Sequence, residues 1–276
     1  AYIDGQVNDV AVNHNELAEA GKAGQIADGS KSRYVNGKGL EYNQAFAKGL
    51  IGALLADQIL NNYLSKAVLD DGINISNNDN KVTENDKNYT TMEHMWDEAY
   101  GYLYGDPSIP VADPNSVLNE SEDRLLFSYL GQVDADSDFA GIAEETYQAF
   151  KKGRAAIVGN DYDTRDEQVI IIRENLSTVI GVRAVHYFQG GKSDIQNGNW
   201  GHAFHALSEG YGFLYSLRFS HNPETGLPYI SPETLKTYRD QLMNGNGFWD
   251  VEADTLDEIS QAIATAFGFT VEETLE

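Results

Sequence analysis

The sequence has 276 residues, with 43 acidic against 19 basic side chains and a formal net charge of −24. A surface this negative repels phosphate backbones and anionic membranes, so the composition argues against nucleic-acid binding. The sequence contains no cysteine, which excludes disulfides, thiolate metal sites and a cysteine nucleophile. No apolar run approaches the length of a membrane span, so we expect no transmembrane segment in this chain.

The first part of the chain changes character near residue 39. Residues 1–38 are rich in Gly, Asn, Ser and Asp and predict an irregular N-terminal arm, with one short helix at residues 15–21. Over residues 40–66 apolar side chains recur at helical spacing, which predicts a helix. The polar residues 70–87 predict a loop. No alternating pattern is long enough to predict a strand.

A second helix follows this loop. Thr90 and Thr91, with Glu93 close behind, are typical of a capping box and predict a helix start. This helix extends to Tyr104, and residues 106–119, which hold three of the six prolines, predict a loop. Further helices are predicted at residues 121–131, 139–159, 166–188, 200–219, 231–243 and 255–267, with a short loop at residues 190–199.

The sequence of the helix at residues 91–104 occurs a second time. TMEHMWDEAYGYLY aligns with HAFHALSEGYGFLY at residues 202–215, and both keep a His-x-x-x-Glu-x-Tyr-Gly-aromatic-Leu-Tyr pattern. We name these segments the first and second signatures. Their preceding helices also match, with Gly52 aligned with Gly181. The pattern predicts an internal duplication, with repeats at about residues 40–105 and 166–219. The fold class is therefore all-α: residues 39–276 form an internally duplicated helical bundle, two related bundles packed as one body.

Each signature places a histidine and a glutamate four residues apart, on one helix face. Imidazole and carboxylate on a rigid helix supply two ligands for a divalent metal, and a facing helix supplies the others. The candidate ligands in the second half are His186, His202, His205 and Glu209, which suit iron or zinc. The related candidates in the first half are Asp57, His94, Asp97 and Glu98, whose oxygen-rich set leans toward harder ions such as calcium.

The same residues also allow a structural interpretation. A buried histidine beside a glutamate is often a hydrogen-bonded pair that fixes the register of helices. Gly101 and Gly212 each place glycine inside a helix, at a cost of about 1 kcal/mol relative to alanine, which indicates close approach by a helix or a ligand. The candidate ligand-binding aromatic residues are Trp96, Tyr100, Trp200 and Tyr211, which either line a glycan-binding groove or fill the core.

A weaker calcium pattern lies further along the chain. Asp134, Asp136, Asp138 and Glu145 stand at four ligand positions of an EF-hand loop, but Phe139 occupies the position that needs glycine. An acidic helix start is the favoured interpretation of this segment.

The segments KGLEYNQAFAKGLIGALLADQILNNYL, EHMWDEAYGYLYG and AFHALSEGYGFLY resemble an uncharacterised bacterial family, a domain of unknown function found in exported, often lipid-anchored proteins. The duplicated layout is distantly similar to the imelysin-like proteins, which are periplasmic or surface proteins linked to iron regulation. Their Gly-x-His-x-x-Glu motif is not reproduced, because Asp97 and Ser208 stand three residues after the two histidines. The resemblance implies a periplasmic or cell-surface protein, possible lipid anchoring of the precursor and an outer-membrane uptake partner.

These observations predict an exported, non-enzymatic metal-binding protein that acts in the acquisition of iron or another transition metal. The alternative is an extracellular module that binds a glycan or another ligand, in which the His–Glu pairs are structural. A metal-dependent hydrolase is disfavoured, because neither an open coordination position nor a general base can be identified.

Overall fold

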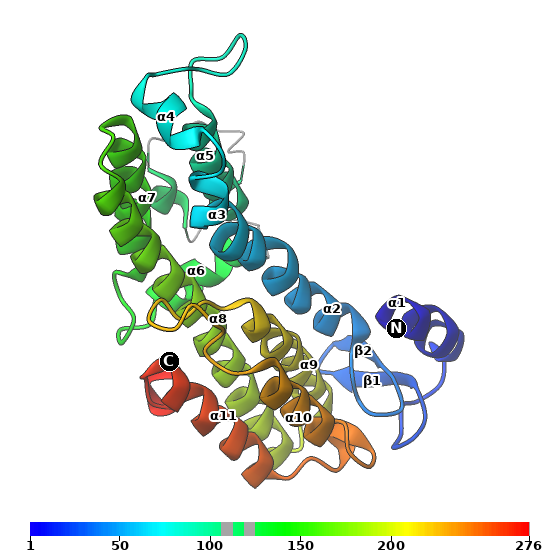
Figure 1. Cartoon of the computed structure of the whole chain (residues 1–276). Helices are drawn as coiled ribbons and strands as arrows, with labels where there is room; N and C mark the ends of the chain where they lie inside the picture. The colour runs from blue at the N-terminus through cyan, green and yellow to red at the C-terminus, as the bar shows by residue number, and fades with distance from the viewer. Residues whose placement is uncertain (106–112, 119–124, 276) are drawn as a thin grey trace. The chain divides into compact units, whose positions relative to one another are not determined.

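The structure is a computed structural model and describes residues 1–105, 113–118 and 125–275. The described residues are mostly helical, as predicted, and include one β-hairpin (Figure 1). The α-helices are α1 (Tyr2–Gly5), α2 (Tyr42–Leu50), α3 (Lys66–Leu69), α4 (Asn74–Asp79), α5 (Thr91–Tyr104), α6 (Leu126–Asp134), α7 (Ile142–Val158), α8 (Tyr162–Gln196), α9 (Trp200–Ser216), α10 (Pro232–Leu242) and α11 (Ala253–Phe267). The strands are β1 (Gly24–Asp28) and β2 (Lys31–Val35).

Shorter or wider helical turns join these elements. Two have π-helical hydrogen bonding, η1 (Gln6–Val10) and η3 (Ile51–Tyr63), and η3 continues α2 directly. The 3-10 turns are η2 (Ala11–Asn13), η4 (Pro114–Val117), η5 (Leu217–Phe219), η6 (Gly247–Trp249) and η7 (Glu272–Thr274). Among the described residues, no helix is both long enough and apolar enough to span a membrane.

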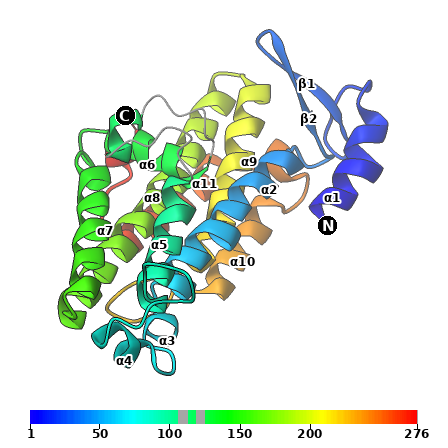
Figure 2. The same ribbon diagram turned by 90° about the horizontal axis from the view of Figure 1, so that it is seen from above.

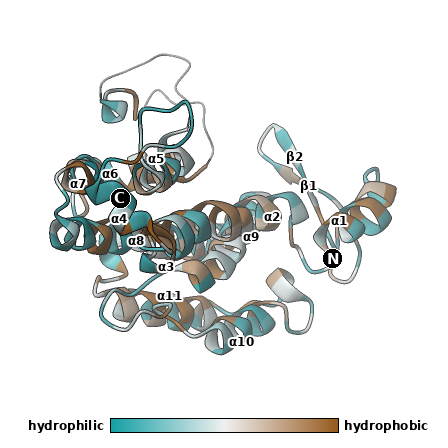
Figure 3. Ribbon diagram, turned by 45° about the horizontal axis from the view of Figure 1, so that its top comes forward, coloured by the Kyte–Doolittle hydropathy of each residue, from teal (hydrophilic) through white to brown (hydrophobic). Residues whose placement is uncertain are grey.

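Residue contacts divide the chain into two compact units. Unit 1 contains Ala1–Gly52, Ile180–Arg218 and Tyr229–Glu276, and unit 2 contains Ala53–Val179 and Phe219–Pro228. This division does not follow the two sequence repeats, because α2 from the first repeat belongs to the same unit as α9 from the second. Helices in both units carry hydrophobic and hydrophilic residues along their length, which is typical of helices that bury one side (Figure 3).

The centre of unit 1 is the packing of α9 along α2 (Figures 1 and 2). Small residues bring the two backbones together. A Cβ atom on Gly212 would lie 2.6 Å from the Cβ of Lys48, so only glycine allows this approach. The Ser216 hydroxyl accepts the N–H of Gly52 at 2.9 Å and donates to the Lys48 carbonyl at 2.6 Å. Because the second signature lies in this buried helix, most of its side chains are removed from solvent.

The N-terminal residues are more regular than the sequence predicts. The expected helix at residues 15–21 is wrong, and helical turns occupy the start of the chain instead, from Tyr2 onward. Strands β1 and β2 pair antiparallel, with Asp28 opposite Lys31. Gly29 in the connecting turn has φ +58°, a conformation that glycine adopts without strain. The hairpin is short and largely polar, so it lacks the alternating pattern that would have predicted it.

The loop expected at residues 190–199 is also wrong over most of its length, because α8 continues to Gln196. Gly190 and Gly191 do not end the helix. A Cβ atom on Gly191 would lie 2.6 Å from the Leu207 side chain, so this glycine allows α9 to pack closely on α8. A packing requirement therefore explains the glycine that suggested a loop.

Unit 2 contains the first signature, in α5. The predicted capping box is confirmed: the Thr90 hydroxyl accepts the Glu93 N–H, and the Glu93 carboxylate accepts the Thr90 N–H at 2.7 Å. Trp96 is fully buried, and its indole N–H donates to the Phe150 carbonyl of α7 at 3.0 Å. The helix predicted at residues 121–131 begins at Leu126 in the described part, while residues 106–112 of the predicted loop and residues 119–124 lie outside the described residues.

Candidate functional site

The second signature contributes two residues to a buried polar cluster between α2 and α9. His205 Nδ1 lies 2.5 Å from Glu41 Oε2, and His205 Nε2 lies 3.9 Å from Glu209 Oε2. The other Glu209 oxygen lies 3.1 Å from Lys48 Nζ. Because a carboxylate only accepts, Nδ1 donates its proton to Glu41. The cluster joins two helices through charge-assisted contacts.

This cluster does not fit a metal ion. The Lys48 ammonium holds the second Glu209 oxygen, and its positive charge would repel a divalent ion placed between His205 Nε2 and Glu209 Oε2. The Glu41 carboxylate already holds one ring nitrogen of His205. The arrangement matches the structural interpretation of the His–Glu pair.

The two remaining histidines predicted as ligands in the second half lie in other surroundings. His186 Nδ1 donates to the Thr274 carbonyl at 2.9 Å. His202 is exposed, and its Nδ1 lies 2.6 Å from Asp194 Oδ2. Across residues 1–105, 113–118 and 125–275, no three His, Asp or Glu side chains are arranged to hold a metal ion.

The four metal ligands predicted in the first half likewise contact different partners and do not form one cluster. Asp57 accepts from the Asn61 amide at 3.2 Å, and Asp97 accepts from Arg154 Nε at 2.8 Å. His94 Nε2 and Glu98 Oε1 are 3.4 Å apart on the partly exposed side of α5, and the His94 ring stacks on Tyr89. This His–Glu pair lies on one helix face, as the spacing predicts.

The acidic segment before α7 is a helix start. Asp134 Oδ1 accepts the N–H groups of Gly141 at 3.0 Å and Ala143 at 2.9 Å. This carboxylate oxygen therefore caps the first turn of α7 instead of facing an ion. Asp136 Oδ1 accepts the N–H of Asp138 in the preceding turn.

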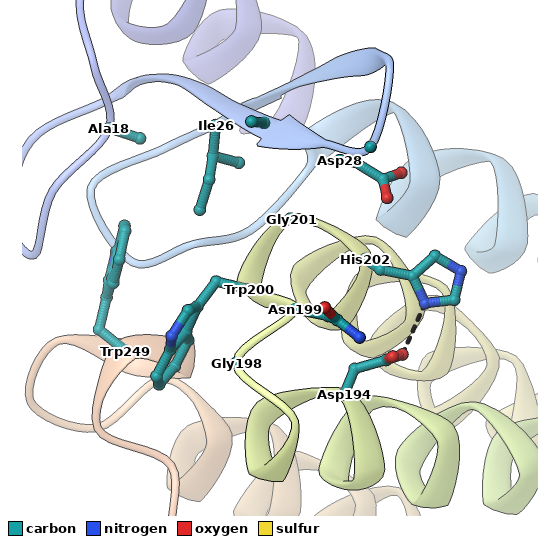
Figure 4. A pocket seen from close by; sticks show the side chains of 12 residues that line it. Ala18, Ile26, Asp28, Asp194, Gly198, Asn199, Trp200, Gly201, His202 and Trp249 are labelled. Carbon is teal, nitrogen blue, oxygen red and sulfur yellow. Dashed lines mark hydrogen bonds and ion pairs between the residues drawn. The ribbon is translucent and has the colours of Figure 1, made fainter.

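A cavity of about 730 Å³ lies in unit 1 where the β-hairpin meets the start of α9 (Figure 4). One side is aromatic: Trp200 and Trp249 stack with ring centroids 6.3 Å apart and planes inclined by 24°. Trp200 is about one-third exposed, so part of its indole surface is open to a ligand. The indole nitrogen of Trp249 is buried and has no hydrogen-bond partner among the described residues.

The opposite side of this cavity is polar. Asp28, Asp194, Asn199 and His202 line it, and Figure 4 shows the Asp194–His202 contact beside the Asn199 amide. The side chain of Asp28 is held by Arg33, whose Nε and Nη2 atoms both lie 2.7 Å from Asp28 Oδ2. Hydrogen-bond donors and acceptors therefore face an aromatic wall across one open cavity. We name this cavity the Trp200 pocket.

The four predicted ligand-binding aromatic residues do not share one site. Trp200 lines the Trp200 pocket. Tyr211 is buried elsewhere in unit 1, where burial raises the pKa of its hydroxyl and the Arg239 guanidinium lies 6.0 Å from its ring centroid. Trp96 and Tyr100 line a different cavity in unit 2.

A family model described as domain of unknown function (DUF4856) matches residues 1–270. The chain belongs to this family. The match confirms the expected relation to an uncharacterised family. Searches of curated proteins and of solved structures give no match.

Sequence reasoning missed several residues of the Trp200 pocket. Asp28 was missed because the hairpin that carries it was not predicted. Asp194 was placed in a loop, whereas it lies in the last turns of α8. Trp249 is, like Trp96 and Trp200, an aromatic residue that the sequence allows in a sugar-binding groove. It lies in a 3-10 turn nearly fifty residues along the chain from Trp200, and no motif links the two positions. The one available signal was the pair of tryptophans in a chain that has only three.

Proposed function

We propose that this protein is a binding protein that holds a carbohydrate in the Trp200 pocket. The observation that carries the proposal is the stacked Trp200–Trp249 wall facing carboxylate, amide and imidazole groups across one open cavity. Sugar rings present apolar C–H faces and a rim of hydroxyls. A flat indole surface packs against such a face, and polar groups opposite it bind the hydroxyls and fix orientation.

The chemistry of the polar side suits neutral sugars. Carboxylates accept hydrogen bonds from hydroxyl groups, while the Asn199 amide both donates and accepts. Asp28 and Asp194 give this side a negative character that disfavours anionic ligands. A polyhydroxylated neutral or amino-bearing sugar is therefore the ligand class that these groups recognise best.

The pocket is also held in place before a ligand arrives. Gly201 packs directly against the Ala27 carbonyl, leaving no room for a Cβ atom, and this contact joins the start of α9 to the hairpin. The Arg33 guanidinium fixes the Asp28 carboxylate. Groups fixed in advance lose less conformational entropy on binding, which favours affinity.

Metal handling is the competing proposal. His202 and Asp194 supply two side chains at the pocket that could coordinate a metal ion. A role in iron acquisition would follow from the imelysin-like resemblance. The buried contacts of His205 with Glu41, and of Glu209 with Lys48, favour the structural role of the second signature instead. Export to the periplasm or cell surface, an origin by duplication and the imelysin-like relationship are part of this account and rest on sequence resemblance.

The test is retention of the protein on neutral polysaccharides in native affinity gels, followed by calorimetric titration with the oligosaccharides that retain it. All samples contain a chelator. Trp200→Ala should abolish retention, because the stacking surface is lost. Phe46→Ala is the matched control, since Phe46 is a similarly exposed aromatic residue of unit 1 outside the pocket.

Two results would contradict the proposal. The first is equal retention of wild type and Trp200→Ala, with unchanged melting temperatures. The second is no retention on any polysaccharide together with near-stoichiometric metal, measured on protein purified without chelator, that disappears in His202→Ala. The second outcome would transfer support to metal handling.

A further inference from the structure

We propose that unit 2 carries a second, separate ligand site, which binds a small aromatic carboxylate between α5 and α7. The site is a cavity of about 440 Å³ whose walls include Trp96 and Tyr100 of α5 and Tyr147, Phe150 and Lys151 of α7. Its volume is suited to a ligand of one or two fused rings. We name it the Lys151 pocket.

The aromatic walls of the Lys151 pocket are fixed. Trp96 donates from its indole nitrogen to the Phe150 carbonyl at 3.0 Å, and Gly153 leaves space for the indole ring that any side chain would fill. Tyr100 meets Phe150 edge to face, with centroids 5.6 Å apart and an interplanar angle of 85°. These rings present both faces and edges, which is the surface that a planar aromatic ligand packs against.

Among the described residues, the polar lining of this pocket contains one cation that is available to a ligand. Arg154 is engaged by two carboxylates, Glu93 at 3.1 Å and Asp97 at 2.8 Å, so its charge is balanced. Lys151 is exposed, and its ammonium lies 5.1 Å from the Tyr147 ring centroid. No carboxylate of the described residues lies within ion-pair distance of the Lys151 ammonium.

This local arrangement runs against the charge of the whole protein. A chain with a net charge of −24 repels anions over most of its surface, so an anion site requires local cations. Lys151 supplies this local cation, because the Arg154 charge is balanced by Glu93 and Asp97. A ligand with a flat ring and a carboxylate would place the ring against the partly exposed Tyr100 and its charge at Lys151. An aromatic cation lacks this partner.

The experiment is calorimetric titration of the full chain with indole-3-propionate at low ionic strength, with tryptamine as the probe of opposite charge. Indole-3-propionate should bind and tryptamine should not. Lys151→Met keeps an unbranched side chain but removes the charge, and it should weaken indole-3-propionate binding about tenfold. Lys152→Met makes the same change one residue away, outside the pocket lining, and should leave affinity within about twofold.

Three results would overturn the proposal: absence of indole-3-propionate binding, equal or tighter binding of tryptamine, or equal losses in the two lysine variants. Both lysines are exposed, so neither substitution should prevent folding. The outcome is independent of carbohydrate binding, because the probes are not sugars and no residue of the Trp200 pocket is altered.

Discussion

The first and second signatures share six of their fourteen residues but have opposite surroundings. In the second, Glu209 is buried and its carboxylate pairs with Lys48, while His205 pairs with Glu41. In the first, Glu98 is about 40% exposed, and His94 lies 3.4 Å from it. A buried ion pair is costly to break, whereas an exposed one contributes little.

The glycines of the two signatures differ in the same direction. Gly212 is in contact with the backbone and Cβ of α2. Around Gly101, no heavy atom of the described residues outside its own helix lies within 4 Å of an added Cβ position. The shared motif therefore forms a helix–helix junction in one unit and a partly solvated helix face in the other. A repeated motif predicts which residues share a face, but not what that face contacts.

The largest expected difference concerns the two glutamates. Glu209→Ala should lower the free energy of unfolding by about 3–5 kcal/mol, because it removes the buried carboxylate that forms the ion pair with the Lys48 ammonium. Glu98→Ala should change the same quantity by less than about 1 kcal/mol. Urea denaturation at neutral pH measures both. Equal losses in the two variants would remove the distinction between the signatures.

The next largest effect is expected for the two glycines, where the same substitution to alanine should change stability in opposite directions. Gly212→Ala should destabilise by about 1–3 kcal/mol, since the new methyl group would overlap Lys48 and the Ala45 carbonyl. Gly101→Ala should stabilise by up to about 1 kcal/mol through helix propensity alone. Thermal melting of the two variants beside wild type provides the comparison. Stabilisation by Gly212→Ala would show that α2 does not pack closely on α9.

At the helix starts, the larger loss of stability is expected in the first signature and the smaller in the second. Thr90 caps α5 and donates to Asn78 at 2.7 Å, so Thr90→Ala should cost about 1–2 kcal/mol. Asn199 precedes α9 without a side-chain capping bond, and Asn199→Ala should cost less than about 0.5 kcal/mol. Denaturation midpoints with unchanged m-values would check both losses. A greater loss at Asn199 would contradict the assignment of the cap to Thr90.

The smallest effect is a loss of stability at low pH. It concerns His221 in unit 2, the unit that contains the first signature. Burial, together with the nearby Arg173 charge, lowers the pKa of His221 to about 4. The unfolded chain therefore takes up this proton first, near pH 6.5. The contribution of His221 to the free energy of unfolding is therefore fully present above pH 6.5 and is lost as pH falls toward 4.

This acid loss should be about 1 kcal/mol, because His221 is only half-buried and solvent screens its charge. His221→Gln should flatten the dependence of the unfolding free energy on pH between 6.5 and 4. An unchanged pH dependence in this variant would assign the acid response to other groups.

The sequence predicted most helices because their apolar residues recur at helical spacing. The first signature helix was predicted to run from Thr90 or Thr91 to about Tyr104, which the structure confirms, since Thr90 and Glu93 mark its start and Gly105 its end. Gly190 and Gly191 misled the prediction, because local composition does not distinguish a glycine that breaks a helix from one that admits a neighbouring side chain. The hairpin lacked a periodic signal altogether.

The candidate site was less predictable for a different reason. The partner of His205 is Glu41, 164 positions away in the chain, and helical spacing contains no information about such a contact. The Trp200 pocket depends on the hairpin and on a 3-10 turn, both outside any motif. Spacing identified the face of α9, whereas long-range packing determined its chemistry.

The central claim is that the second signature is a buried structural junction that holds α9, and with it the Trp200 pocket, in place. A double-mutant cycle on Lys48 and Glu209, measured by urea denaturation, tests this claim most directly. Lys48→Met and Glu209→Leu alone should each be strongly destabilising, and the double variant should recover most of that loss, because no unpaired charge remains buried. A double variant whose loss equals the sum of the two single losses would contradict the account.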